Sequence, residues 1–568
     1  MSVELVIAQR VEGPPARTDV PRSVTLADPT QCRRDVVAIL AVAVVAVLLR
    51  AGPVLGSDFP LNDGGLFYVM ARDIQRLGFG WPAFTSYNGG TIPFAYPPLG
   101  PMLAALLANL LPVPLLQWFL WLPLLFSCLT VAGVYLVARQ LLDSRFDALA
   151  AAAAFAVVPE GYQWLIEGGG VTRAPGFLFA LFAVVFVLRW RKGGGILNAG
   201  MASVMAGVAL LFHPSAGLFA AVSIAILLFR RPFGRSLATI LLVGGGMALV
   251  AAPWWVVALI RVGPAGLTSA GGLSGPAGGL LTGGFDLVTF TLTGEVAMPW
   301  VGALGVLGLV RALSRREWLL PAWLVVEVLV DQRLGLMFAA VPVSLLAATG
   351  LSAVVVPAVA GLVPPFGSGH LPGRLWQVRS ARWLLIFAVE GAVLSGLLFN
   401  ASAGSPEHGL PPADRAAMSW VAANTPSSAQ FAVVTSDPSG SEGTQEWFPA
   451  LTGRESDSVP QGSEWLGPGV WSARYAENID LQACAGQTAG CLRAWLTLHG
   501  VSGTYVFLPK GHLRGPGSAA DCCMSLRESL QNTSDFDLVY DGPGASIYRW
   551  APARADARRA RPRATSRA

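Results

Sequence analysis

Apolar stretches of the kind that cross a lipid bilayer recur along the first two thirds of the chain. They cover residues 36–55, 115–138, 147–162, 174–188, 196–212, 215–229, 236–260, 297–313, 318–330, 334–357 and 383–399. With 53% hydrophobic and only 13% charged residues, the chain is too apolar for a soluble protein of 568 residues. A helix needs about 20 apolar residues to cross the hydrocarbon core. The sequence therefore predicts a mostly α-helical, polytopic membrane bundle with about 11 spans, within a range of about 10–13.

Basic residues cluster between alternate apolar stretches, and such loops stay on the cytoplasmic side. The basic loops are residues 139–145, 189–192, 230–235, 311–316 and 374–382. The N-terminal segment 1–34, which ends in Arg33 and Arg34, is then cytoplasmic and disordered. The predicted external segments are the first loop 56–114, the loops 163–173, 261–296 and 331–333, and everything after residue 400.

All of these basic loops fall on the cytoplasmic side only if the apolar segment 97–111 does not cross the membrane. It opens with Pro97 and Pro98 and is of marginal length. We therefore predict a re-entrant or interfacial helix there. The resulting protein is a multi-pass protein of the cell membrane, and residues 35–400 form its membrane domain.

From about residue 401 the composition becomes that of a soluble domain. Residues 416–421 predict a helix, residues 431–435 and 504–508 predict buried strands, and residues 537–550 predict a strand pair joined by an Asp-Gly-Pro-Gly turn. We expect a small α/β extracytoplasmic domain over 401–550, followed by a disordered Arg-rich tail, 551–568. Its cysteines favour one or two disulfides, with a metal site as the alternative, and they are Cys484, Cys491, Cys522 and Cys523.

Two carboxylates, Asp58 and Asp63, follow the first apolar stretch in the segment SDFPLNDGGLFYVMARDI. A carboxylate at the membrane surface is costly against lipid and so marks a polar cavity or a site. Gly64 and Gly65 let a ligand or a second backbone come close to Asp63. Apolar residues at helical spacing over 66–77 predict an interfacial helix. Asp63 therefore marks a candidate functional site, and the alternative is that it only caps this helix.

Further candidate side chains fall in the predicted external loops. Glu167 and Arg173 flank a run of glycines, where Arg173 can hold a phosphate through paired N–H donors; the alternative for both is a surface ion pair. His213 at a helix junction and Arg333 in a short turn are candidate ligands of an anionic group. Their alternatives are a satisfied helix end for His213 and snorkelling to the interface for Arg333. Tyr96 is expected to shape an acceptor groove.

The order of the segments NDGGLFYVMARDI, AYPPLG and IEGGGVTRAPG resembles membrane glycosyltransferases of the GT-C superfamily. These include protein O-mannosyltransferases, lipid A aminoarabinose transferases and the catalytic subunit of oligosaccharyltransferase. The C-terminal domain resembles that of uncharacterised prokaryotic members in the segments AAMSWVAANTPSSAQFAVVT, EWFPALTGRESDSVPQGSEWL and DLVYDGPGASIYRW.

The resemblance implies a hexosyl- or pentosyltransferase of the GT-C fold. Such an enzyme takes a sugar from a polyprenyl-phosphate carrier and passes it, with inversion, to a glycan, lipid or protein acceptor on the extracytoplasmic face. An acid of the first external loop acts as general base; Asp63 fits that position best, Asp58 is the reserve candidate, and Tyr68 falls at the position of the family's aromatic residue. Glu167 is a further catalytic candidate, which can orient the acceptor, assist the base or bind a divalent cation. A second acid binds such a cation in some relatives, so Mg²⁺ or Mn²⁺ stays open as a cofactor.

Two other classes of function fit a membrane protein of this kind. One is a transporter or flippase for lipid-linked sugars, and the other is a non-catalytic protein of envelope assembly. A transporter built from repeats predicts paired halves, of which the sequence shows no trace. The absence of a Walker loop or dinucleotide fingerprint argues against a cytoplasmic nucleotide-sugar donor. The formal charge of +5 is small for this size and gives no reason to expect nucleic acid as a partner.

Overall fold

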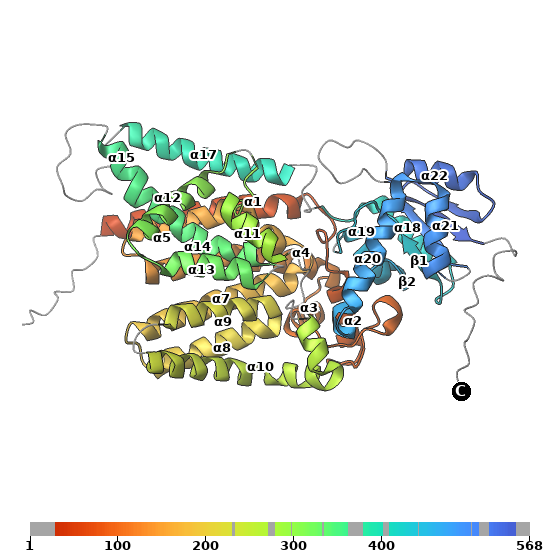
Figure 1. Ribbon diagram of the computed structural model, residues 1–568, viewed down its shortest axis with the longest axis horizontal. Helices are drawn as coiled ribbons and strands as arrows, with labels where there is room; N and C mark the ends of the chain where they lie inside the picture. The colour runs from red at the N-terminus through yellow and green to blue at the C-terminus, as the bar shows by residue number, and fades with distance from the viewer. Residues whose placement is uncertain are drawn as a thin grey trace, which may run out of the picture. The chain divides into compact units, whose positions relative to one another are not determined.

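The computed structural model describes residues 29–229, 233–270, 279–296, 298–331, 334–361, 379–401, 408–440, 442–500, 503–510 and 522–551 (Figure 1). The two predicted disordered tails lie outside these residues, except for residues 29–34 and Ala551, and so does Arg333. Residues up to Ala41 and residues from Val42 onward form two separate compact units. The first unit holds only the start of helix α1 among the described residues, and the second holds all other elements.

The described part of the chain before residue 402 is helical, as the apolar stretches predict. Its helices are α1 (Pro29–Leu55), α2 (Gly65–Arg76), α3 (Leu99–Leu110), α4 (Leu115–Leu141), α5 (Arg145–Val157), α6 (Gln163–Ile166), α7 (Gly170–Arg191), α8 (Ile196–Phe212), α9 (Pro214–Leu228), α10 (Phe233–Ala270), α11 (Gly279–Thr289), α12 (Trp300–Ser314), α13 (Leu319–Val330), α14 (Gly335–Gly350), α15 (Val356–Gly361) and α17 (Arg379–Ala401).

Each of the predicted apolar stretches forms a helix, but the helices differ in length. Within the described residues, five segments are long and apolar enough to cross a bilayer alone, and a bent pair makes a sixth. The five are Val36–Leu55, Leu115–Leu141, Gly170–Arg191, Ser236–Ala270 and Gly335–Val359. The other apolar helices have 10–17 residues, which is shorter than the about 20 residues of a perpendicular span. The chain is thus a multi-pass membrane protein. Helix α3 has only 12 residues, a length compatible with the re-entrant or interfacial helix predicted for residues 97–111.

The stretch predicted as one span over residues 147–162 is broken. Helix α5 ends at Val157, and the segment Pro159–Ile166 continues at an angle of 90°. Pro159 has no N–H for the carbonyl of Phe155, four residues earlier, and so it cannot continue the helical ladder. The buried guanidinium of Arg50 donates to that carbonyl instead, with Nη2 at 3.4 Å. The break turns the chain back toward α7, so that Glu167 lies beside the start of that helix.

The predicted loop 261–296 is also more helical than expected. Helix α10 runs on to Ala270 through a kink at Gly263, which has φ +68°, and α11 occupies Gly279–Thr289. Likewise, the predicted loop 163–173 holds α6 and the first turn of α7. Both segments are rich in glycine, which disfavours helix, so packing against neighbouring helices must stabilise them, and local composition does not reveal those neighbours.

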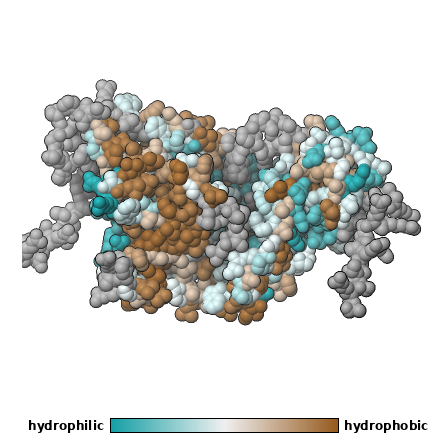
Figure 2. Space-filling view, in the orientation of Figure 1, coloured by the Kyte–Doolittle hydropathy of each residue, from teal (hydrophilic) through white to brown (hydrophobic). Residues whose placement is uncertain are grey.

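Aromatic and small residues build the core of the bundle. The ring of Phe177 on α7 lies 5.4 Å from Phe219 on α9 and 5.2 Å from Phe338 on α14. Gly176 on α7 lies so close to the start of α9 that an added Cβ would meet Ala216 at 3.0 Å. Small residues at such contacts let membrane helices approach closely. Hydrophobic side chains cover much of the face of the bundle that Figure 2 shows, and Leu249 on α10 is 76% exposed.

The C-terminal domain is a small α/β fold, as predicted. Its helices are α18 (Pro412–Asn424), α19 (Gly443–Thr452), α20 (Val470–Gln482), α21 (Ala489–His499) and α22 (Met524–Gln531). Its strands are β1 (Gln430–Val433), β2 (Glu455–Ser456), β3 (Tyr505–Pro509), β4 (Phe536–Asp541) and β5 (Ala545–Trp550). The sheet order is β2-β1-β3-β5-β4, in which β1 pairs in parallel with β2 and β3, and β5 pairs antiparallel with β3 and β4.

The cysteines of this domain are paired with one another. Disulfides join Cys484 to Cys491 and Cys522 to Cys523. The described residues contain no group of three or more His, Cys, Asp or Glu side chains arranged for a metal ion. The cysteine arrangement therefore agrees with the predicted disulfides.

The first loop and the C-terminal domain share one hydrophobic core. Phe59 and Phe67 from the loop pack in the same cluster as Phe431 of β1, Trp447 of α19 and Ile547 of β5. The rings of Phe59 and Trp447 lie 4.7 Å apart. Because this core is continuous, the C-terminal domain holds α2 and the residues before it in place. Asp63 lies in that segment, between the C-terminal domain and the start of α7.

Candidate active site

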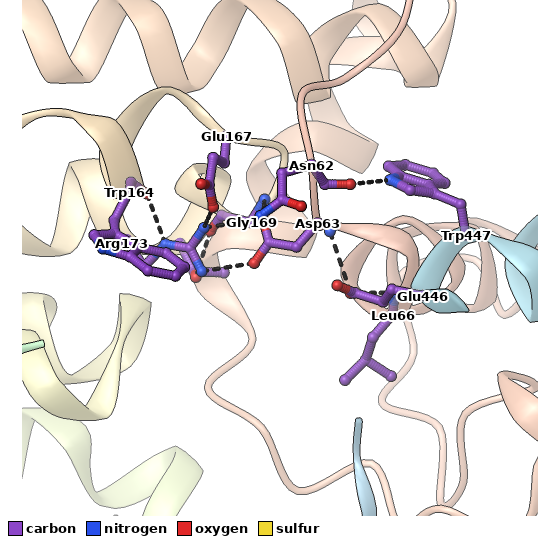
Figure 3. A network of polar contacts seen from close by, with 11 residues as sticks. Asn62, Asp63, Leu66, Trp164, Glu167, Gly169, Arg173, Glu446 and Trp447 are labelled. Atoms are coloured by element: carbon purple, nitrogen blue, oxygen red, sulfur yellow. Dashed lines mark hydrogen bonds and ion pairs between the residues drawn. The ribbon is translucent and has the colours of Figure 1, made fainter. Parts of the chain in front are cut away.

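Asp63 is the centre of a buried polar network (Figure 3). Its Oδ2 accepts from Nη1 of Arg173 at 2.8 Å, and its Oδ1 accepts from Nη2 at 2.9 Å. Oδ1 also accepts the backbone N–H of Gly169 at 2.8 Å. Asp63 is 3% exposed and Arg173 8% exposed, so the pair is shielded from water. A two-pronged, charge-assisted pair of this kind fixes both side chains in one orientation.

Glu167 completes the network as a second carboxylate on the same guanidinium. Nη2 of Arg173 donates to its Oε2 at 3.1 Å, while Nε of Arg173 donates to the carbonyl of Trp164 at 2.7 Å. The predicted alternative of an ion pair between Glu167 and Arg173 is thus present, but Glu167 is 0% exposed and the pair is not a surface one. Two ionised acids around one guanidinium carry a net negative charge, which a buried site holds only through such hydrogen bonds.

The backbone around Asp63 takes conformations that its sequence favours. Asn62 has φ +46° and Gly64 has φ +120°, and asparagine and glycine tolerate positive φ better than other residues. The N–H of Gly168 donates to the carbonyl of Leu61 at 2.8 Å. A Cβ on Gly168 would lie 2.1 Å from the carbonyl oxygen of Asp63. The glycines after Glu167 therefore allow the two backbones to touch, which places Asp63 beside Arg173.

Asp63 does not cap α2, contrary to the alternative from the sequence. The N-cap residue is Gly64, and no side chain of the cap residue makes a capping hydrogen bond. The cap is supplied from the C-terminal domain by Glu446 on α19. Its Oε1 accepts the N–H groups of Gly64 at 3.2 Å and Leu66 at 3.4 Å. Asp63 is consequently left to pair with Arg173.

Glu446 is the member of the site that the sequence analysis did not identify. It opens the segment EWFPALTGRESDSVPQGSEWL, whose resemblance to relatives was the only available signal. It is 1% exposed. Burial, followed by repulsion from Asp63, raises its pKa from the ordinary 4.5 to about 8, although the N–H groups of Gly64 and Leu66 act in the opposite direction. At neutral pH this carboxyl therefore carries a proton.

An aromatic cluster lies next to the charged network. The ring of Tyr96 is 6.0 Å from that of His213 and 6.0 Å from that of Trp465, and it also lies within electrostatic range of Arg173. His213 is the N-cap of α9, and its Nδ1 accepts the N–H of Ser215 at 3.1 Å. Neutral His213 then carries its proton on Nε2. The structure thus combines the helix-end role of His213 with a place beside Tyr96.

The remaining predicted site residues lie apart from this network or outside the described residues. Tyr68 on α2 packs its ring 5.7 Å from Trp447 and 5.8 Å from Phe119. Asp58, with a 68% exposed side chain, pairs with Arg415 of α18 at 2.5 Å. Arg333 lies outside the described residues, so its predicted role stays a prediction. The structure therefore brings together Asp63, Glu167 and Arg173, with Tyr96 and His213 beside them.

The close approach at Gly169 provides a direct test of this geometry. A Cβ there would lie 2.6 Å from Oδ2 of Asp63 and 2.9 Å from Nη1 of Arg173. Gly169→Ala is expected to lower the free energy of unfolding by about 1–3 kcal/mol, because a buried, hydrogen-bonded pair must shift. Thermal unfolding in detergent measures this change.

The matched control is Gly200→Ala on α8, where nothing lies within 4 Å of the added methyl group. Alanine favours helix over glycine, so this variant should be as stable as the unchanged protein or more stable. Equal behaviour of the two variants would contradict the packing at Gly169.

The hydrogen bonds of the network leave one oxygen of Asp63 able to accept a further hydrogen bond. Oδ1 of Asp63 accepts two N–H groups and Oδ2 accepts one, so Oδ2 keeps a lone pair for a further donor. A carboxylate held in this way can accept a proton from a hydroxyl group placed against Oδ2.

Part of the chain matches a known protein family. A family model described as dolichyl-phosphate-mannose-protein mannosyltransferase matches residues 95–257, which include Glu167 and Arg173. No curated protein sequence matches the chain.

Several solved structures have a similar fold. The oligosaccharyltransferase AglB from Archaeoglobus fulgidus, in complex with an inhibitory peptide and a dolichol-phosphate, is 15% identical over 85% of this chain and 70% of that chain, with a TM-score of 0.55. The oligosaccharyltransferase of the same organism in complex with Zn and sulfate is 16% identical over 89% and 79%, with a TM-score of 0.52. ArnT from Cupriavidus metallidurans bound to undecaprenyl phosphate is 15% identical over 90% and 97%, with a TM-score of 0.49.

At this level of identity the structural likeness concerns the fold. The apolar helices and the small sheet agree with the fold of the solved oligosaccharyltransferase. Residues 95–257 therefore match the mannosyltransferase family model, and the chain shares the overall fold of that oligosaccharyltransferase.

Proposed function

We propose that this protein is a membrane glycosyltransferase that moves a sugar from a polyprenyl-phosphate carrier to an acceptor on the extracytoplasmic face. The observation that carries the proposal is the convergence of Asp63, Glu167 and Arg173 in one buried network. The description of the matched family, a dolichyl-phosphate-mannose transferase, and the dolichol-phosphate in the AglB complex support a lipid-linked donor. In this proposal the N-terminus is cytoplasmic and the C-terminal domain is extracytoplasmic.

Asp63 acts as the general base in the proposed reaction. An acceptor hydroxyl donates to Oδ2, the oxygen with a free lone pair, and passes its proton to the carboxylate as its oxygen bonds to the anomeric carbon. The bond from that carbon to the carrier phosphate breaks, and the phosphate leaves with the electron pair. The products are the glycosylated acceptor, inverted at the anomeric carbon, and polyprenyl phosphate. Asp63 then returns its proton to water.

Arg173 receives the phosphate in this proposal. Its fork of N–H donors matches a phosphate as well as a carboxylate, and it stabilises the negative charge that develops on the leaving group. A phosphate that engages Arg173 would compete with Asp63 for those donors and so free the carboxylate to act as base. Glu167 keeps its own contact with Nη2 and holds the guanidinium in place. Arg333 is proposed as a second positive group for the phosphate.

The aromatic residues are proposed to bind substrate around this centre. Tyr96 and His213 lie side by side next to Arg173, where Nε2 of His213 can donate to a phosphate or a sugar hydroxyl. Tyr68 packs on Trp447 and forms part of the wall that fixes α2.

The test is a transfer assay with purified protein in detergent. Polyprenyl-phosphate carriers with labelled hexoses and pentoses are incubated with glycan, lipid and peptide acceptors, and labelled product and free polyprenyl phosphate are measured. We expect both products in equal amounts. Flipping of the labelled carrier across vesicles without cleavage would instead indicate a transporter. Binding of the carrier without cleavage or flipping would indicate a non-catalytic protein of envelope assembly.

The same assay tests the divalent cation that we propose as an option. Glu167 and Asp63 already share Arg173, so a cation bound to these acids would have to displace part of that contact. Treatment with EDTA followed by Mg²⁺ or Mn²⁺ is expected to abolish and restore transfer if the cation takes part. Transfer that is unaffected by EDTA would remove the cation from the proposal.

A further inference from the structure

We propose that Glu446 of α19 is a positioning residue for Asp63, so that the C-terminal domain supplies a working part of the site. This inference rests on the proposed function. The inference goes beyond the proposed function because that function assigns no role to an acid of the C-terminal domain.

The hydrogen bonds of Glu446 reach the backbone on the C-terminal side of Asp63. Its Oε1 accepts the N–H of Gly64, the next residue, and of Leu66 in the first turn of α2. These N–H groups lack acceptors inside the helix, and the carbonyl oxygen of a protonated carboxyl group can accept their hydrogen bonds. The carbonyl of Gly64 and the N–H of Tyr68 then begin the helical ladder at 2.9 Å. Glu446 thus sets where α2 begins, and with it the direction in which Asp63 leaves the backbone.

The contact between α19 and this segment is tight along its length. A Cβ on Gly65 would lie 2.5 Å from the carbonyl oxygen of Glu446, and one on Gly443 would lie 2.8 Å from the carbonyl oxygen of Asn62. The indole Nε1 of Trp447 donates to the same carbonyl of Asn62 at 2.9 Å. The hydroxyl of Tyr87 donates to the carbonyl of Glu446 at 2.8 Å. These contacts therefore fix the backbone of residues 62–65 relative to α19.

The backbone contacts of α19 do not account for the buried carboxyl group of Glu446. Oε2 of Glu446 is buried and has no hydrogen-bond partner among the described residues. Such an atom is rare in folded proteins and costs free energy. The charged and titratable groups that face Glu446 are Asp63, Arg173 and Tyr87, and Glu464 lies near Tyr87. A second negative charge here would lie beside Asp63 and would also compete for the positive charge of Arg173.

Protonation of Glu446 links these contacts to pH. Burial and Asp63 raise its pKa to about 8, so the neutral form caps α2 at neutral pH without adding charge to the Asp63 network. Above that pH the ionised form repels Asp63, which alters the direction of its carboxylate relative to Arg173. We expect the rate of transfer to decline as pH rises through about 8, in addition to any other ionisation.

The test compares Glu446→Gln and Glu446→Ala in the transfer assay. Glutamine keeps the acceptor oxygen for the N–H groups of Gly64 and Leu66 but cannot ionise. It should retain kcat within about threefold at pH 7 and lose the decline near pH 8. Alanine removes the cap and should lower kcat on the order of 10²-fold, with little change in the KM for the carrier, because Asp63 is displaced. The control is Glu528→Gln on α22, an exposed residue, which should leave both constants unchanged.

Two results would overturn the inference. A Glu446→Ala variant that folds and keeps the kcat of the unchanged protein shows that the cap does not position Asp63. A Glu446→Gln variant that keeps the same alkaline decline shows that Glu446 is not the ionising group.

A second measurement does not depend on sugar transfer. Because the pKa of Glu446 is raised in the folded protein, its proton adds stability at low pH, and that stability is lost as pH rises from about 4.5 to about 8. The Tm of the unchanged protein relative to Glu446→Gln should fall over this window and stay level above it. In an Asp63→Asn background the fall should shrink, because one cause of the raised pKa is gone.

These outcomes separate the two proposals. Failure of the unchanged protein to transfer any sugar would contradict the proposed function, and the Tm comparison would still decide whether Glu446 and Asp63 are coupled. A Tm difference that does not vary with pH, or one that is the same with and without Asp63, would overturn the inference whatever the transfer assay shows.

Discussion

Asp63→Asn is expected to lower the rate of sugar transfer by about 10²- to 10⁴-fold, the usual contribution of a general base. An amide of nearly the same size cannot accept a proton at neutral pH. It also replaces one of the two oxygens that bind Arg173 with an NH₂ group, so the guanidinium keeps Glu167 but loses half of its contact with residue 63. Binding of the polyprenyl phosphate should persist, because Arg173 is then freer to meet the phosphate. Transfer rate and carrier binding are measured on the same purified variant.

The control for this prediction is Asp58→Asn. Asp58 was the reserve candidate for the base, but its side chain is exposed and pairs with Arg415 at the surface. Exposed ion pairs contribute about 0.2–1 kcal/mol, so this variant should transfer sugar within about twofold of the unchanged protein. A large loss with Asp58→Asn and none with Asp63→Asn would exchange the roles of the two residues. Unchanged transfer in both would remove the base from the first loop altogether.

Arg173→Met is expected to destabilise the fold by about 3–5 kcal/mol, because it leaves Asp63 and Glu167 buried without a positive partner. Thermal unfolding in detergent measures this loss. Arg173→Lys keeps the charge but not the planar fork that binds two acids at once. It should fold with a smaller loss of stability and still lose most of the transfer activity.

A double variant and a surface control make this prediction specific. Removing the acid as well, in Arg173→Met with Asp63→Asn, should destabilise less than the sum of the two single changes, because fewer buried charges are left unpaired. Arg311→Met removes an arginine with a 23% exposed side chain whose ion-pair partner Glu317 is 53% exposed, and it should cost about 1 kcal/mol or less. Additive effects at Arg173 and Asp63 would contradict their direct contact.

The membrane-domain half of the site could be predicted from the sequence because polar residues stand out in apolar surroundings. Asp63, Glu167 and Arg173 are charged residues beside glycines at the ends of apolar stretches, and such charges are kept near a membrane only for a site or a partner. Helical periodicity and strand alternation likewise predicted α2 and four of the five strands of the C-terminal sheet. Only β2, with two residues, is too short to carry a pattern.

Other features depended on distant neighbours and had weak signals or none. Pro159 lies inside a predicted span and marks the break after α5, but whether a proline kinks or breaks a membrane helix depends on what satisfies the freed carbonyl. Here Arg50, over 100 residues away, supplies the donor. Glu446 lies in a soluble domain, where a glutamate is normally exposed, and nothing in its local sequence indicates burial.

The sequence by itself determined that the chain is a multi-pass helical protein with a small α/β domain, and which charged side chains of the membrane domain are costly unless used. Those properties follow from transfer free energies and local periodicity, which each stretch of chain carries independently. Only the tertiary structure decided that Arg173 binds both acids, that Asp63 is not a helix cap, and that Glu446 takes that role. The contacts of Asp63 with Arg173 and of Glu446 with Leu66 join residues 110 and 380 positions apart, and their energies depend on burial and distance, which exist only once the chain has folded.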